Sequence, residues 1–437
     1  MYIPELEFLK ERNTRKSSMD MTSSITNNFA NNLNLTNNIN NINNINNINN
    51  INNTDTFEYK KSSKTKVYKG SKEIESLLNS DLNQNDNINN LLTKIDHYKF
   101  KKLDLANKSI NNVTLRLLAN SPNFSSNIKM LNLTDNKFNE YGMIYLSNIT
   151  LHKSLESLDL SSNYLTCNMV KCLIPVENVN DKISNLKELI LKDNLIEAKG
   201  INSLTNNPYF SKLVNIDLSK NSIEDKGLEY IKVNQKNLIN LERLNISDNK
   251  ITKLGMDILN SCSSFLSHLT HLNLSCNKIE TEGILKLIIN KSFKNIIYLN
   301  IKQCQLTIEV LKQMMHSENC LNIKYLDFGG NKLKLGHLSN KNKKNEDKNK
   351  FYLQNLIRLS LKSNEINDND IKSLIKLKLL NNLEYLNLSI NKIGKKGVDS
   401  LIEEYIDNFS VKINLQGNFE LSTKTKHDLE NNNKFII

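Results

Sequence analysis

Cysteine and histidine are among the residues of this chain that can act as nucleophiles or hold a metal. The 437-residue sequence contains six cysteines and seven histidines. No CxxC pair, HExxH helix, GxSxG turn or GxxxxGK[ST] phosphate loop occurs. His268 and His271 are three residues apart outside a helix, which is a poor spacing for a shared metal. Cys304, in YLNIKQCQL at 298–306, remains as a candidate reactive thiol, and its role depends on the elements that position it.

The composition narrows the class of protein. Proline and glycine are scarce, at 4 and 12 residues, which argues against a turn-rich β-sandwich. The net charge of +12 comes from dispersed lysines, so nucleic acid is not an expected partner. No apolar run approaches the ~18 residues of a membrane span, and the N-terminus lacks an apolar signal region. Without paired cysteines, we expect a cytoplasmic or nuclear location.

A repeat occupies most of the chain. The pattern apolar-x-apolar-x-x-Asn-x-apolar, as in LNLTDNKF, LNISDNKI and LNLSINKI, runs through twelve copies at spacings of 27 to 33 residues, and ten of the copies keep the Asn. A sustained period of this length predicts a solenoid. The residues in the Asn position, called the Asn slot below, are Lys108, Asn136, Asn163, Asn194, Asn221, Asn249, Asn277, Cys304, Asn331, Asn364, Asn391 and Asn418.

Each copy predicts a short strand, a turn and then a helix. One copy cannot bury its own apolar face, so stacked copies must form a parallel sheet with helices behind it. The slot amide both donates and accepts hydrogen bonds, and we expect a ladder of such amides to satisfy the backbone at each turn. Loss of one internal rung should cost ~1–3 kcal/mol. Cys304 lies in this ladder, so we expect an inward-facing thiol that alkylates slowly.

Glycine follows the slot by six residues in half of the copies, at Gly142, Gly200, Gly227, Gly255, Gly283 and Gly397. With the 27–28-residue period, residues of about 95–420 resemble the leucine-rich-repeat family, in its ribonuclease-inhibitor-like subclass. The resemblance implies an α/β solenoid of about 12 repeats, a curved horseshoe with a parallel sheet on the concave face and helices on the convex face.

Four regions follow from these patterns. Residues 1–72 are predicted to be disordered, because 27–53 holds 17 Asn and 58–72 is rich in lysine. Self-association of the Asn-rich tract and a nuclear-localisation role for the lysines remain alternatives. Residues 73–97 are predicted to form a helical cap, 98–421 the repeat array with a Lys/Asn-rich insertion near 338–353, and 422–437 a C-terminal cap and tail.

The concave face is the predicted binding surface. Three side chains of each strand point away from the core, and equivalent positions of stacked strands form columns. The middle column is mostly Asp and Asn, which is common in the family and says little about a ligand. The first column is aromatic, cationic or His from the sixth repeat onward, and Tyr and Arg often dominate protein interfaces. The predicted partner-binding residues are Arg243, His271, Tyr298, Lys302, Tyr325, Arg358, Lys362 and Tyr385.

These features predict a non-enzymatic interaction module or scaffold, without cofactor or metal, that binds a partner protein on its concave face. One alternative is a regulator of a small GTPase, because Ran GTPase-activating proteins resemble this repeat type. Another is an axonemal or cytoskeletal scaffold, because several flagellar proteins resemble the same repeat class. Alanine at Tyr298, Tyr325 and Tyr385 should abolish partner binding in the first case.

Overall fold

The structure is a computed structural model whose chain divides into two units, Met1–Lys69 and Gly70–Ile437. The residues that it describes all lie in the second unit. Residues 1–72, the core of the 338–353 insertion and residues 422–434 of the expected C-terminal cap and tail lie outside the described residues. The described residues are 80, 85–98, 100–121, 124, 127–136, 138–150, 154–174, 184–333, 335–336, 351–376, 382–405, 411–418 and 435–436.

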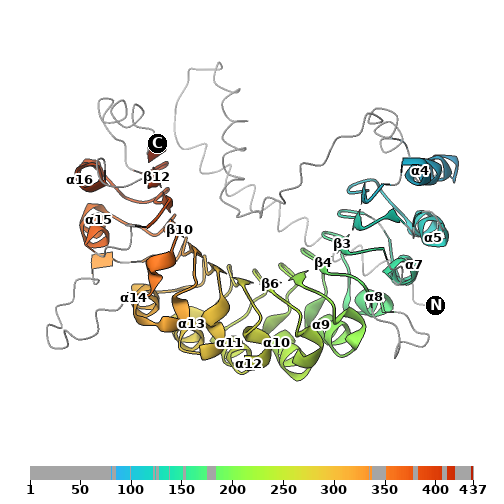
Figure 1. Cartoon of the computed structure of the whole chain (residues 1–437), viewed down its shortest axis with the longest axis horizontal. Helices are drawn as coiled ribbons and strands as arrows, with labels where there is room; N and C mark the ends of the chain where they lie inside the picture. Colours follow the sequence, from blue (N-terminus) through green and yellow to red (C-terminus); the bar gives the residue numbers. More distant parts are fainter. Residues whose placement is uncertain are drawn as a thin grey trace, which may run out of the picture. The chain divides into compact units, whose positions relative to one another are not determined.

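The strands form one parallel, open sheet in chain order, each paired with the next. This confirms the predicted α/β solenoid. Figure 1 shows the strands along the inner side of the array and the helices along its outer side. The strands are β1 (Lys102–Asp104), β2 (Met130–Asn132), β3 (Ser157–Asp159), β4 (Glu188–Ile190), β5 (Asn215–Asp217), β6 (Arg243–Asn245), β7 (His271–Asn273), β8 (Tyr298–Asn300), β9 (Tyr325–Asp327), β10 (Arg358–Ser360), β11 (Tyr385–Asn387), β12 (Lys412–Asn414) and β13 (Phe435–Ile436).

Strand β13 was not expected from the sequence. It pairs in parallel with β12, where the N–H of Leu415 donates to the carbonyl of Ile436 at 2.7 Å. Phe435 is buried in the core. The last repeat is therefore covered by a strand in a segment that lacks the repeat pattern.

Helices follow the strands on the outer side. Apolar spacing places Met256 and Leu259 of α11 in the same continuous core as Leu244 and Ile246 around β6. Thr252 is the N-cap of α11, and its side-chain hydroxyl accepts a hydrogen bond from the N–H of Leu254. The α-helices are α4 (Asn85–Tyr98), α5 (Asn112–Asn120), α7 (Glu140–Thr150), α8 (Cys167–Cys172), α9 (Glu197–Thr205), α10 (Glu224–Val233), α11 (Lys253–Asn260), α12 (Ser263–Leu266), α13 (Glu280–Ile288), α14 (Ile308–His316), α15 (Asp368–Ile375) and α16 (Lys395–Tyr405); the 3₁₀ helices are η3 (Pro208–Phe210), η4 (Gln235–Leu238), η5 (Lys291–Asn295), η6 (Glu318–Cys320) and η8 (Leu353–Asn355).

The repeated glycine has a steric cause. A Cβ on Gly255 would lie 2.2 Å from Oδ1 of Asp225 and 2.7 Å from Cγ2 of Ile251. A Cβ on Gly397 would lie 2.6 Å from Oδ1 of Asp368. Each of these carboxylates belongs to the preceding outer helix, so the glycine lets consecutive helices approach closely.

The first end of the array is covered by α4. Its Ile88 and Leu91 are fully buried and belong to the same core as the repeats. The helix reaches Tyr98, next to the boundary expected between cap and array at residue 97. The earlier part of the expected cap, 73–79, lies outside the described residues.

Candidate partner-binding surface

The Asn slots bridge consecutive repeats. The Asn249 amide donates to the carbonyls of Leu218 at 2.8 Å and Ser247 at 3.0 Å. Its Oδ1 accepts the N–H groups of Asn221 at 2.9 Å and Ile223 at 3.3 Å. The amide of every other Asn in the slots likewise donates to a carbonyl of the preceding repeat, at Asn136, Asn163, Asn194, Asn221, Asn277, Asn331, Asn364, Asn391 and Asn418.

Two slots lack an asparagine. Lys108 stands at the first rung, where its N–H donates to Oδ1 of Asn136 at 3.2 Å. Cys304 is fully buried, and its thiol lies 3.2 Å from the carbonyl of Leu274 and 3.4 Å from that of Lys302. Burial raises the pKa of the Cys304 thiol to about 12. A neutral, enclosed thiol is a poor nucleophile, so this residue serves the repeat.

The first column of the concave face forms an unbroken row. Register pairs Arg243 with His271, then Tyr298, Tyr325, Arg358, Tyr385 and Lys412 in successive strands. Arg358 and Lys412 are exposed, and the other five are half-buried. Neighbours in this row are about 4.8 Å apart along the sheet. The structure thus brings six of the eight predicted partner-binding residues together in one row.

Burial sets the charge of this row. The rings of His271 and Tyr298 stack with centroids 5.8 Å apart and an interplanar angle of 20°. Burial, with Arg243 nearby, lowers the pKa of His271 to about 4, so the imidazole is neutral at pH 7. Burial also raises the pKa of Tyr298 to about 12. The positive charge of the row therefore resides on its arginines and on Lys412.

The other two predicted residues, Lys302 and Lys362, lie in the third column with Gly329 between them. Both lysines are half-buried. A Cβ on Gly329 would lie 3.5 Å from Cγ of Lys302 and 3.3 Å from the carbonyl of Lys362. The N–H of Gly329 donates to Oδ1 of Asp327 at 2.9 Å, and Asp327 is 7% exposed. The two lysines thus stand on either side of a position that has no side chain.

The middle column has a structural task. Oδ1 of Asp159 accepts the N–H of Ser161 at 3.0 Å, and Oδ1 of Asn300 accepts that of Lys302 at 3.1 Å. Such bonds two residues onward close a turn at the strand end, which only Asp and Asn make well. The same bond forms at Asp104, Asn132, Asp217, Asn245, Asn273, Asp327, Asn387 and Asn414.

The first half of the concave face is held by hydrogen bonds between neighbouring residues of its first column. Glu188 accepts from Oγ of Ser157 at 2.5 Å and from Nδ2 of Asn215 at 2.9 Å. Beside this column, Lys129 and Lys187 bind Glu156 at 2.5 and 2.9 Å and lower its pKa. Polar groups that already bind one another gain less from a partner.

A second Asn row escaped the sequence analysis. Nδ2 of Asn295 donates to the carbonyl of Ser267 at 2.7 Å, and Nδ2 of Asn322 to that of Lys294 at 2.8 Å. Asn240, Asn355 and Asn382 bind the preceding repeat in the same way. The signal was present, since these residues stand three before the first column in NLER, NIIY, NIKY, NLIR and NLEY. Amides thus join consecutive repeats on both sides of the strands.

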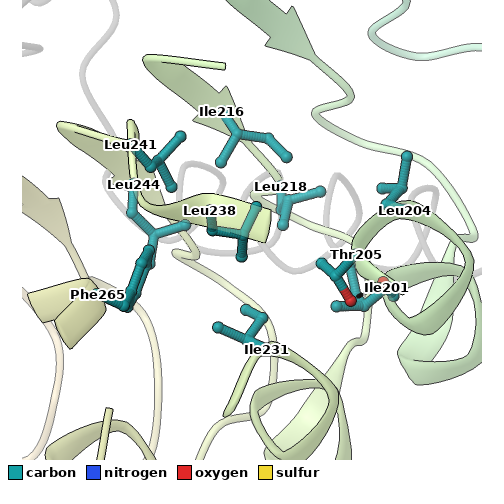
Figure 2. Close-up of a pocket in the computed structure, with 10 residues that line it drawn as sticks. All are labelled: Ile201, Leu204, Thr205, Ile216, Leu218, Ile231, Leu238, Leu241, Leu244 and Phe265. Atoms are coloured by element: carbon teal, nitrogen blue, oxygen red, sulfur yellow. Dashed lines mark hydrogen bonds between the residues drawn. The ribbon is translucent and has the colours of Figure 1, made fainter. Parts of the chain in front are cut away.

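The interior holds a small cavity of about 10 Å³ (Figure 2). Side chains of α9 and α10 face those of β5 and β6 across it. Thr205 is its one polar lining residue, and its hydroxyl donates to the carbonyl of Ile201 at 2.9 Å. A water molecule needs more polar partners than this, so the space is a packing gap. The lining residues are Ile201, Leu204, Thr205, Ile216, Leu218, Ile231, Leu238, Leu241, Leu244 and Phe265.

The described part of the chain offers neither a metal cluster nor a membrane-spanning helix. There, no three His, Cys, Asp or Glu side chains gather to hold a metal ion. None of the helices described here combines the length and apolar character needed to cross a bilayer.

Comparison with protein families decides the class. A model described as a leucine-rich repeat matches residues 211–232, 237–257, 265–287 and 380–401. The chain is a leucine-rich-repeat protein. The four matches contain β5, β6, β7 and β11, so they fall on the same unit that the Asn slots define. Comparison with curated proteins finds no match.

Comparison with solved structures finds several chains that are similar at low identity. An internalin from Listeria monocytogenes is 18% identical with a TM-score of 0.44, covering 77% of this chain and 88% of the internalin. A chain of the mouse RP105/MD-1 complex is 19% identical with a TM-score of 0.41, and the match covers 77% of this chain and 58% of that one. A chain of the yeast Rad7 and Elc1 complex is 14% identical with a TM-score of 0.41, and the match covers 89% of this chain and 96% of that one. At these values the likeness says nothing of the partners of this leucine-rich-repeat protein.

Proposed function

We propose that this leucine-rich-repeat protein is a non-enzymatic interaction module that binds a partner protein on the concave face over β6–β12. The observation that carries the proposal is the row from Arg243 to Tyr385, where register aligns tyrosine and arginine on neighbouring strands. Such side chains provide large contact areas and charged hydrogen bonds. Because the sheet already holds them in place, little ordering is needed on binding.

The state of the nucleophilic groups supports binding rather than catalysis. Cys262, Cys304 and Cys320 are buried, and burial raises the pKa of their thiols to about 11, 12 and 12. His271 is neutral and stacked against Tyr298. Thiols that stay protonated and an imidazole that resists protonation suit packing and contact.

The finer classification is also a proposal. Two features support the ribonuclease-inhibitor-like subclass. The outer helices are full helices, as in α10 and α16, and glycines stand where consecutive outer helices approach closely. A role as a cytoplasmic or nuclear scaffold, with a disordered 1–72 region, remains a prediction. So do the two alternative functions. Single-turnover GTP hydrolysis by Ran would test GTPase regulation, and imaging of a tagged copy would test a cytoskeletal role.

The test of the proposal is partner capture with the full chain. Affinity purification and mass spectrometry would compare the wild type with a variant carrying Tyr298→Ala, Tyr325→Ala and Tyr385→Ala. We expect the variant to lose the captured partners, because it removes three aromatic contacts from one row. Circular dichroism would check that the variant is folded.

A matched variant changes three tyrosines outside the concave columns, Tyr141, Tyr164 and Tyr230, to alanine. Tyr141 is 68% exposed and Tyr164 is 45% exposed. This variant should keep the partners. If the concave variant is folded and captures the same proteins as the wild type, the surface is wrongly assigned.

A further inference from the structure

The charge of the concave face changes sign along the sheet, and this points to the chemistry of the partner. Over the described strands β6–β12, the three columns carry five cationic side chains and one carboxylate. That carboxylate, Asp327, is 7% exposed and already binds the N–H of Gly329. The cations are Arg243, Lys302, Arg358, Lys362 and Lys412.

Strands β1–β5 carry the opposite balance. There, the same three columns hold four carboxylates and only two lysines. The carboxylates are Asp104, Asp159, Glu188 and Asp217, on β1, β3, β4 and β5. Complementary fields steer and orient partners, while like charges brought together destabilise a complex. A negatively charged segment is therefore directed to β6–β12 and kept from β1–β5.

Resting on the proposed function, we infer that the partner presents an extended acidic segment that lies across β8–β10. Lys302 and Lys362 are two strands apart, about 10 Å along the sheet. A chain in the polyproline II conformation has three residues per turn and advances about 3.1 Å per residue, so two carboxylates three residues apart lie on one face, about 9 Å apart, and match the spacing of the two lysines. The missing side chain at Gly329 leaves room for the backbone between them.

The aromatic row completes the fit. Tyr298 and Tyr325 stand on β8 and β9, the strands whose ends carry Lys302 and Gly329. Their rings offer apolar area in the first column, four residues and up to about 13 Å before the charged positions along each strand, where a neighbouring part of the same partner would lie. Arg358 on β10 is exposed and can bind a carboxylate with two parallel hydrogen bonds.

Nucleic acid fits this surface less well. A long polyanion binds by neutralising many phosphates in succession. Here the cations cover one half of the face, and the other half is acidic. A protein segment of limited length uses the positive half alone.

The experiment uses the full chain and a fluorescein-labelled peptide in which glutamate recurs every third residue between serine and glycine. Fluorescence anisotropy would be measured at about 50 mM and about 300 mM salt. We expect binding that weakens with salt, and about tenfold weaker binding of the same peptide with glutamine in place of glutamate. Lys302→Glu with Lys362→Glu should weaken binding of the glutamate peptide by about tenfold or more.

The matched control is Lys278→Glu with Lys332→Glu. These lysines are exposed, are also two repeats apart, and stand just outside the three columns, one residue after their Asn slots. The control changes the net charge equally and should leave peptide binding within about twofold of the wild type.

Three results would overturn the inference: equal binding of the glutamine peptide, equal losses in both lysine variants, or tighter binding of a single-stranded RNA to the same lysines. Partner capture separates this inference from the proposed function. If capture depends on the tyrosines but survives Lys302→Glu with Lys362→Glu, the acidic segment is wrong and the interaction surface stands. If the variant with alanine at the three tyrosines captures the same partners as the wild type, the proposed function itself is wrong.

Discussion

Replacing Cys304 with asparagine should stabilise the protein. The thiol has one proton, which two carbonyls share at 3.2 and 3.4 Å. The equivalent amide of Asn249 makes four hydrogen bonds, two donated and two accepted. At the Cys304 rung, the N–H groups of the preceding repeat that match those bonded by Asn249 are those of Asn277 and Ile279. Sulfur, a weak acceptor, stands where they would meet an amide oxygen.

The backbone at Cys304 already suits an amide. The residue before the slot is left-handed in both repeats, with φ of 53° at Gln303 and 53° at Asp248. Two buried N–H groups would gain an oxygen acceptor, and one more proton would reach a carbonyl. Each hydrogen bond contributes ~0.5–1.5 kcal/mol net, and burying a larger polar group offsets part of this. We therefore expect Cys304→Asn to raise the free energy of unfolding by ~1–2 kcal/mol.

Urea denaturation followed by circular dichroism would measure this gain, since the chain has no tryptophan. Asn249→Cys is the mirror variant, built in a repeat of the same backbone shape, and should lose ~1–3 kcal/mol. If Asn249→Cys is costly while Cys304→Asn brings no gain, the thiol rung is already satisfied and the hydrogen-bond argument is refuted.

The pH dependence gives an independent check. The pKa of Cys304 is about 12 in the folded protein, against an ordinary value of 9.0 for a cysteine thiol. The unfolded thiol ionises first as pH rises, so the wild type loses stability from pH 9 upward, and Cys304→Asn removes this contribution. The difference between the two proteins should therefore widen above pH 9. A constant difference would show that the thiol is not held neutral by burial.

Three further substitutions test other parts of the structure. Ile390 is 53% exposed and left-handed at φ 54°, so Ile390→Asn should raise the free energy of unfolding by ~1 kcal/mol, while Ile390→Val should not. Gly255→Ala should lower it by ~1–3 kcal/mol in the same urea assay, because the new Cβ meets Asp225; a neutral result would mean that the helices separate freely. The pKa of His271 falls from 6.5 to about 4 on folding, so the protein should lose stability as pH drops through this range. His271→Gln should flatten that slope, and an unchanged slope would place the titration elsewhere.

Much of the array was predictable because the chain repeats a local rule. Alternation with a period of two decides which strand residues face the core, and an in-register parallel sheet then stacks equivalent positions into columns. The row from Arg243 to Lys412 follows from these two facts. The second Asn row was equally visible, three residues before the first column, but remained unrecognised.

Other features depended on atoms brought together from different repeats. The middle-column carboxylates and amides are occupied by turns, and the neutral state of His271 comes from burial against Tyr298 and from Arg243. Strand β13 lies in a segment without the repeat pattern, and its pairing with β12 is a long-range contact.

The sequence by itself determined the repeat, the direction of each strand residue and the columns, because these depend on local periodicity alone. Only the tertiary structure decided which of those side chains keep charge and exposure. Solvent access, pKa and hydrogen bonding are set by neighbours about one repeat away in the chain, as at the gap over Gly329 between Lys302 and Lys362.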